Sequence, residues 1–162
     1  MGSRNRAGVK RRLAEIAEYS LRDLGVQVAY GWPGDTVETS TLFFAGVEGN
    51  SEVAGMQLGQ QPKEDRFTVP ALVAVTPFMD VVDAEERAEL VVRVFDDALR
   101  GCQRLKDRAG VIPDGDDPTI FAGVRSAVIT SAQGPYASLS QPTQNAPIVG
   151  LYQFDIECVS DI

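Results

Sequence analysis

The stretch that decides the fold begins with Glu64-Asp-Arg-Phe-Thr-Val-Pro-Ala-Leu-Val-Ala-Val-Thr-Pro77 and continues to Arg104. From Phe67 to Val75 every second residue is apolar, which is the pattern of a strand with one face on a core. Leu72 and Ala74 add apolar residues on the other parity. We therefore expect the second half of this strand to be covered on both sides.

A long helix is predicted after a short turn, from about Asp83. Its apolar residues recur at spacings of three and four and form a wide stripe, namely Ala84, Ala88, Val91, Val92, Phe95, Ala98, Leu99, Cys102 and Leu105. Asp83 is the expected N-cap, because Glu86 follows at the spacing of a capping box and both carboxylates favour the helix dipole. This strand and helix form the pair to which the rest of the chain is added.

A first helix is predicted over residues 5–24, with Gly25 placed to end it. One face of this helix is apolar and carries Val9, Leu13, Ile16, Ala17, Leu21 and Leu24. Two strands should follow, over residues 26–32 and 41–47. The second is apolar on both parities, so we expect it to be central or covered on both sides.

Two further strands are predicted after the long helix, over residues 123–132 and 150–159. The last one alternates most clearly, with Tyr152, Phe154, Ile156 and Cys158 on one face and Gln153, Asp155 and Glu157 on the other. Such alternation is typical of a strand that is buried on one side only.

Two segments show no hydrophobic period and are predicted to be long loops. They cover residues 48–63 and 133–147, which are rich in Gln, Asn, Ser, Gly and Pro. Loops of this length are uncommon in a compact domain unless they bind something. We therefore expect contacts with another subunit in these segments.

The predicted order is helix, three strands, helix, two strands. This order indicates an α+β fold, a two-layer sandwich in which a mostly antiparallel sheet of about five strands carries two helices packed on one face. With 162 residues the chain fits a single domain, 1–162. A short basic arm is expected at residues 1–8.

The overall charge is acidic, at −8, although the first dozen residues are basic. The basic residues there are Arg4, Arg6, Lys10, Arg11 and Arg12, which we interpret as a solvated helix start or arm. Because a domain that binds polyanions normally has a basic face, general affinity for nucleic acid is not expected. No apolar run approaches the ~20 residues that span a bilayer, so we expect a soluble protein without membrane contact. Cys102 and Cys158 are expected to be buried free thiols.

The sequence contains no histidine, no Cys-x-x-Cys and no glycine-rich phosphate loop. Histidine-based catalytic triads, thiolate zinc sites and nucleotide loops are therefore excluded. We predict no catalytic, cofactor-binding or metal-binding residues, and no enzyme activity. The Asp-Gly-Asp-Asp run at 114–117 lacks the spaced ligands and the closing Glu of a calcium loop, and a turn is expected there. A small ligand- or metal-binding module that uses Asp116 and Asp117 is the alternative from a different functional class.

Several short signatures resemble a known family. They are Gly31-Trp-Pro-Gly-Asp35, Leu42-Phe-Phe-Ala-Gly46, Lys63-Glu-Asp-Arg-Phe-Thr-Val69, Asp83-Ala-Glu-Glu-Arg-Ala88 and Phe154-Asp-Ile-Glu-Cys158. Together with the amphipathic first helix, they make the chain similar to the tail terminator proteins of long, non-contractile-tailed bacteriophages. Another head–tail connector or tail-completion protein is the alternative with the same layout.

The resemblance implies a structural virion protein located at the head–tail junction and assembled in the host cytoplasm. Copies of it would form a ring, commonly a hexamer, that caps the tail tube, ends its polymerisation and joins the tail to the head connector. Its partners would be further copies of itself, the tail tube protein and the connector protein. DNA would pass through the ring without specific binding, since an acidic channel repels phosphates.

The candidate functional residues follow from this interpretation. Those expected at the assembly interface are Glu48, Asn50, Glu52, Gln57, Gln60, Gln61, Gln133, Tyr136, Gln141 and Gln144. Asp155 and Glu157, on the polar face of the last strand, are the candidates for lining the channel.

Overall fold

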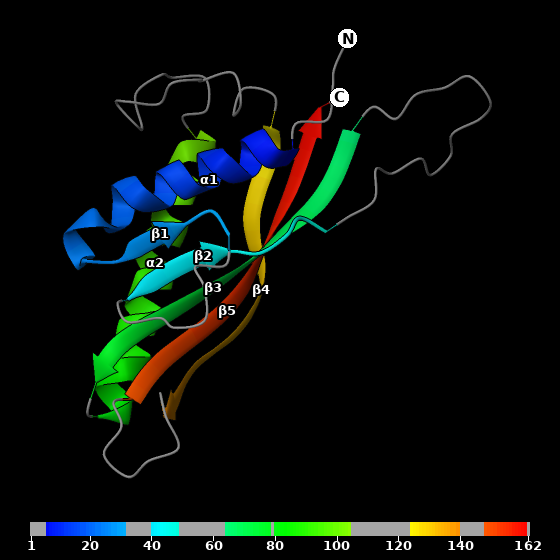
Figure 1. The fold of residues 1–162 in the computed structure, drawn as a ribbon. Helices are drawn as coiled ribbons and strands as arrows, with labels where there is room; N and C mark the ends of the chain where they lie inside the picture. The colour runs from blue at the N-terminus through cyan, green and yellow to red at the C-terminus, as the bar shows by residue number, and fades with distance from the viewer. Residues whose placement is uncertain are drawn as a thin grey trace, which may run out of the picture.

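The computed structural model describes residues 6–31, 40–48, 64–78, 80–104, 124–139 and 148–161. Figure 1 shows its elements in order: α1 (Arg6–Leu21), η1 (Arg22–Leu24), β1 (Gln27–Ala29), β2 (Thr41–Phe44), β3 (Glu64–Phe78), α2 (Val81–Arg104), β4 (Val124–Leu139) and β5 (Ile148–Asp161). The predicted order of helix, three strands, helix and two strands is confirmed.

The five strands form one sheet in the order β1-β2-β3-β5-β4. Only β1 and β2 are parallel, and the other neighbouring pairs are antiparallel. β3 lies at the centre of the sheet, between β2 and β5. Within the described part of the chain, β1 and β4 are the edge strands.

The core lies between the sheet and the two helices. The alternating residues of β3 from Phe67 to Val75 are all buried, and they share one hydrophobic cluster with the apolar stripes of α1 and α2. Both helices therefore cover the same face of the twisted sheet, as Figure 1 shows. The α+β fold predicted from the sequence is confirmed.

Three aromatic rings join the layers at the middle of the core. Phe95 of α2 is fully buried, with its ring centroid 6.2 Å from that of Phe44 on β2 and 5.9 Å from that of Phe154 on β5. Edge-on and tilted ring pairs at such distances add to the free energy gained by burial. The apolar stripe of α2 therefore packs against both β2 and β5 through Phe95.

The first turn of α2 crosses very close to β5. A Cβ placed on Gly150 would collide with the carbonyl oxygen of Ala84. A glycine at position 150 is therefore what allows α2 and β5 to approach so closely.

The start of α2 differs from the prediction. The side chain of Asp80 accepts a hydrogen bond from the Val82 N–H at 2.8 Å, and its carbonyl accepts one from the Ala84 N–H at 3.1 Å. Asp80 is therefore the N-cap, and the assignment of Asp83 to that position was wrong. Asp83 lies in the first turn, where its charge still favours the dipole. Val81 and Val82 are exposed, so the apolar stripe did not reveal that the helix includes them.

Strand lengths also differ from the predictions. β1 and β2 are shorter than residues 26–32 and 41–47, although β2 is buried on both faces as expected. β4 is longer and extends to Leu139, so the loop predicted over 133–147 is strand in its first part. The pairing of β4 with β5 shifts register between Ile129 and Ser131 and between Gln133 and Tyr136. Each shift changes the parity of the side chains, which hid the alternation.

Most of the described basic side chains near the N-terminus are packed against the protein, and Arg4 lies outside the described residues. α1 already begins at Arg6, within the arm predicted over 1–8. Lys10 is 7% exposed, with its Nζ 4.2 Å from the ring centroid of Tyr30, and the largely buried Arg12 contacts Glu15 at 3.0 Å. The interpretation of this cluster as solvated is wrong for these side chains. It holds for Arg11, which is exposed.

Candidate functional site

The sheet face opposite the helices carries exposed residues of β4 and β5 in the described part of the chain. Along β5, Phe154, Ile156 and Cys158 are buried in the core. Gln153 and Glu157, on the opposite parity, are exposed, and Asp155 is half-buried. The one-sided burial predicted for the last strand is therefore confirmed. We call the surface on this side of β3, β4 and β5 the open face.

Strand pairing places other polar residues on the open face. Ser131 of β4 is paired with Asp155, and Gln133 of β4 with Gln153. Residues directly opposite each other in antiparallel strands project to the same side. Tyr136 is on this side as well, because it is paired with Leu151.

Glu48 reaches the open face from beyond β2. Its N–H and carbonyl exchange hydrogen bonds with Thr68 of β3, at 2.9 and 2.6 Å. Thr68 is in turn paired with Glu157. The structure thus gathers on one surface all the candidate residues that it describes: Glu48, Gln133, Tyr136, Asp155 and Glu157.

The other candidates lie outside the described residues. They are Asn50, Glu52, Gln57, Gln60, Gln61, Gln141 and Gln144. Gln133 and Tyr136 come from β4 and not from a loop, which corrects their predicted setting.

A hollow of about 170 Å³ lies in the open face. Its lining consists of Pro70, Ala71, Ser131, Gln133, Gln153, Phe154 and Asp155. The register of β4 relative to β5 shifts between Ile129 and Ser131, directly beside this hollow. Ser131 and Gln153 were not predicted as site residues from the sequence. The alternation of Gln153 with Phe154 was the signal that could have identified it.

The polar side chains of the hollow are not used by the fold. Within the described part of the chain, the side chains of Ser131, Gln133, Gln153 and Asp155 form no hydrogen bond or ion pair with one another or with other groups. A half-buried carboxylate and two amides are therefore available to an incoming group. The amide oxygens and the carboxylate can accept hydrogen bonds, and the amide nitrogens can donate them.

The charge of the open face is predominantly negative. Its described charged residues are the carboxylates of Glu48, Asp155 and Glu157 and the guanidinium of Arg66. Such a surface attracts basic partners and repels a phosphate backbone.

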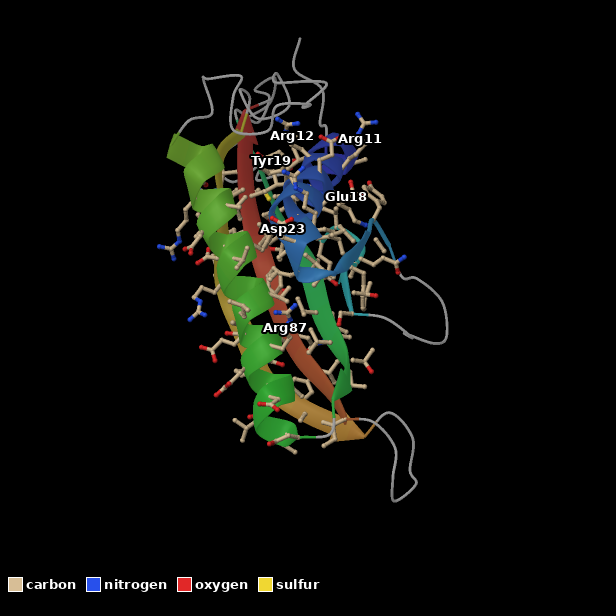
Figure 2. All side chains as sticks on the ribbon, turned by 90° about the vertical axis from the view of Figure 1, so that its left-hand side faces the viewer. Arg11, Arg12, Glu18, Tyr19, Asp23 and Arg87 are labelled. Carbon is tan, nitrogen blue, oxygen red and sulfur yellow. The ribbon has the colours of Figure 1, made fainter. Side chains whose placement is uncertain are left out.

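In contrast to the acidic open face, the start of α1 carries the basic residues Arg6, Lys10, Arg11 and Arg12. The Arg6 guanidinium donates two hydrogen bonds to the fully buried carboxylate of Asp65, at 2.8 and 2.7 Å, and lies 5.4 Å from the ring centroid of Phe67. The hydrogen bond with Asp65 raises the pKa of Arg6. Burial lowers the pKa of Lys10. In Figure 2, Arg11 and Arg12 are labelled at this end of α1.

Metal and thiol chemistry have little support in the described residues. No group of three or more His, Cys, Asp or Glu residues in the described ranges could hold a metal ion. Asp116 and Asp117 lie outside those ranges. Burial, with a smaller contribution from Glu157, raises the pKa of the Cys158 thiol to about 12. This thiol is free and packed in the core.

No protein-family model and no curated protein matches the chain. The helices that the structure describes are all too short or too polar to cross a membrane.

Proposed function

We propose that this chain is a structural virion protein that forms a ring on the end of a phage tail tube. The ring stops tube polymerisation and joins the tail to the head connector. The observation that carries the proposal is the gathering of Glu48, Gln133, Tyr136, Asp155 and Glu157 on one uncovered face of a helix-backed sheet. The family resemblance of the short sequence signatures supplies the identity of the partners.

The fold suits a protein that acts through contacts between surfaces. Phe95 of α2 packs against aromatic rings from the strands on both sides of β3, which fixes this helix to the sheet. Within the described part of the chain, the polar side chains of the hollow, Ser131, Gln133, Gln153 and Asp155, form no hydrogen bond or ion pair and remain available for partners. In this role the protein contacts further copies of itself, the tail tube protein and the connector protein, and it performs no catalysis.

A tube-polymerisation assay tests the proposal. The tail tube protein is allowed to polymerise with increasing amounts of this protein, and tube lengths are measured by electron microscopy. We expect shorter tubes with blunt, capped ends. Unchanged lengths would contradict tube capping, and binding to the connector alone would favour another head–tail joining role.

Surface variants make this assay specific. The triple change Gln133→Ala, Tyr136→Ala and Glu157→Lys should abolish capping without altering the circular dichroism spectrum. The matched control changes Glu86, Glu89 and Arg93 to Ala on the exposed side of α2, and this variant should still cap the tubes.

A further inference from the structure

The hollow in the open face has the chemistry of a receptor for a guanidinium group. A carboxylate that is partly removed from water is more stable when a counter-charge lies beside it. Asp155 is half-buried and has no such partner in the described part of the chain. Together with the amide oxygens of Gln133 and Gln153, it offers several acceptors for the planar fork of donors that arginine presents.

The arginines of the chain itself differ in their availability. Arg6 is bound to Asp65, Arg12 to Glu15 and Arg100 to Asp96. Arg87 donates a hydrogen bond to the carbonyl of Leu24. These four guanidinium groups are therefore engaged within their own copy.

Arg11 and Arg93 are exposed and lack a described partner, but their surroundings differ. Arg93 lies one turn from Glu89 and one turn from Asp97, both exposed, so an acidic surface would meet like charges there. Arg11 also has an acidic residue one turn away, Glu15, but that carboxylate is bound to Arg12 at 3.0 Å. Arg11 also lines a shallow groove with the exposed ring of Tyr30, which offers an aromatic contact beside the charge.

We propose that the basic start of α1 in one copy docks on the open face of a second copy, with Arg11 in the hollow against Asp155. This inference rests on the proposed ring and deepens it by naming the contact between neighbours. It assigns Asp155 to the interface and leaves Glu157 as the candidate for the channel.

The arrangement of layers gives this contact a direction. The helices and the open face lie on opposite sides of the sheet (Figure 1), so the contact joins the back of one copy to the front of the next. Such a heterologous contact continues from copy to copy and forms a ring when the rotation closes. Two open faces placed against each other would bring Asp155 and Glu157 close to the same carboxylates of the partner, which charge repulsion disfavours.

Two single charge reversals test the contact in the full-length chain. Arg11→Glu and Asp155→Lys should each weaken self-association by about tenfold or more in sedimentation velocity. The matched control, Arg93→Glu, reverses an exposed arginine outside the contact and should associate like the unmodified protein. Thermal unfolding checks that each variant is folded.

Mixing the two reversed variants provides the decisive result. In an equimolar mixture, the two reversed charges meet each other at one contact, while the native Arg11 and Asp155 meet at the next. The mixture should therefore assemble although neither variant does so alone. Failure of the mixture to recover, or wild-type-like association of either single variant, would overturn the contact.

The contact and the ring's function have separate readouts. An unmodified protein that remains monomeric at its highest soluble concentration overturns the self-contact. The tube-length assay judges capping independently. Capping that persists in both single reversals would leave the proposed function standing and remove this interface.

Discussion

At the scale of single residues, the core depends on Phe95. Its ring is fully buried and contacts aromatic rings from β2 and β5. We predict that Phe95→Ala lowers the free energy of unfolding by about 3–5 kcal/mol, since it removes a large side chain and leaves a cavity. Denaturant titration measures this change. Phe95→Leu should lose clearly less, and equal losses would indicate that the site repacks freely.

The pair of Arg6 and Asp65 shows how one residue can fix a helix end. Asp65 is fully buried, and its described ion-pair partner comes from the first residue of α1. We predict that Arg6→Met lowers the free energy of unfolding by about 2 kcal/mol or more, because the buried carboxylate of Asp65 loses its two hydrogen bonds and ion pair with Arg6. Arg6→Met combined with Asp65→Leu should recover part of that loss in the same denaturant titration. A double variant that loses the sum of both single changes would contradict this coupling.

The thiol of Cys158 leads to a prediction about reactivity. Its raised pKa, about 12, means that the folded state disfavours the thiolate. The free energy of unfolding that this shift contributes is fully present below the pKa of Cys158 in the unfolded chain. It is lost as the pH rises from that unfolded value to about 12. We expect Cys158 to react with a thiol reagent only after unfolding at neutral pH, as mass spectrometry would reveal. Rapid labelling of Cys158 in the folded protein would contradict its buried position.

At the scale of elements, the contact between α2 and β5 leads to a glycine prediction. Gly150→Ala should lower the free energy of unfolding by about 1–3 kcal/mol or more, because its Cβ would collide with the Ala84 carbonyl. Gly101→Ala is the matched control within α2, where a Cβ meets no atom within 4 Å. That change should be neutral or stabilising by about 0.5–1 kcal/mol. Thermal unfolding of both variants measures the difference, and similar destabilisation at both positions would argue against the close crossing.

Element type was predictable from the sequence, whereas several boundaries were not. The alternation from Phe67 to Val75 and the stripe around Phe95 identified the central strand and helix because burial imposes those periods. The N-cap at Asp80 was missed since the exposed Val81 and Val82 show no helical period. Part of β4 was missed because residues 133–147 show no hydrophobic period, and the register shifts of β4 change the parity of its side chains.

At the scale of the whole molecule, the candidate site shows what sequence can and cannot provide. The polar parity of β5 identified Asp155 and Glu157 directly. Ser131 was missed because its place beside Asp155 depends on the pairing of β4 with β5, which joins residues far apart in the chain. Gln133 was a candidate, but its place in a strand beside Gln153 depends on the same pairing. The basic segment at the start of α1 was visible as a charge cluster. The contact between Arg6 and Asp65 could not be predicted from the sequence, because the two residues are far apart in the chain.

The overall charge gives a prediction for nucleic acid. With a net charge of −8 and a mainly acidic open face, the protein should not retain duplex DNA at moderate ionic strength. Glu48→Lys combined with Glu157→Lys should produce measurable, salt-sensitive binding in fluorescence anisotropy. The control Glu86→Lys with Glu89→Lys makes the same charge change on α2. Equal binding by both variants would show that only the net charge matters.

The irregular pairing of β4 also affects how copies of the chain can meet. Its partnership with β5 is broken by several shifts, and Pro135 carries no N–H to donate. A strand from a neighbouring molecule would find only short regular runs of backbone groups along β4, such as residues 126–129, so continuous growth of the sheet along this edge is disfavoured. The β4 edge is therefore a poor template for cross-β aggregation in crowded solution, while the side chains of the open face can still form reversible contacts.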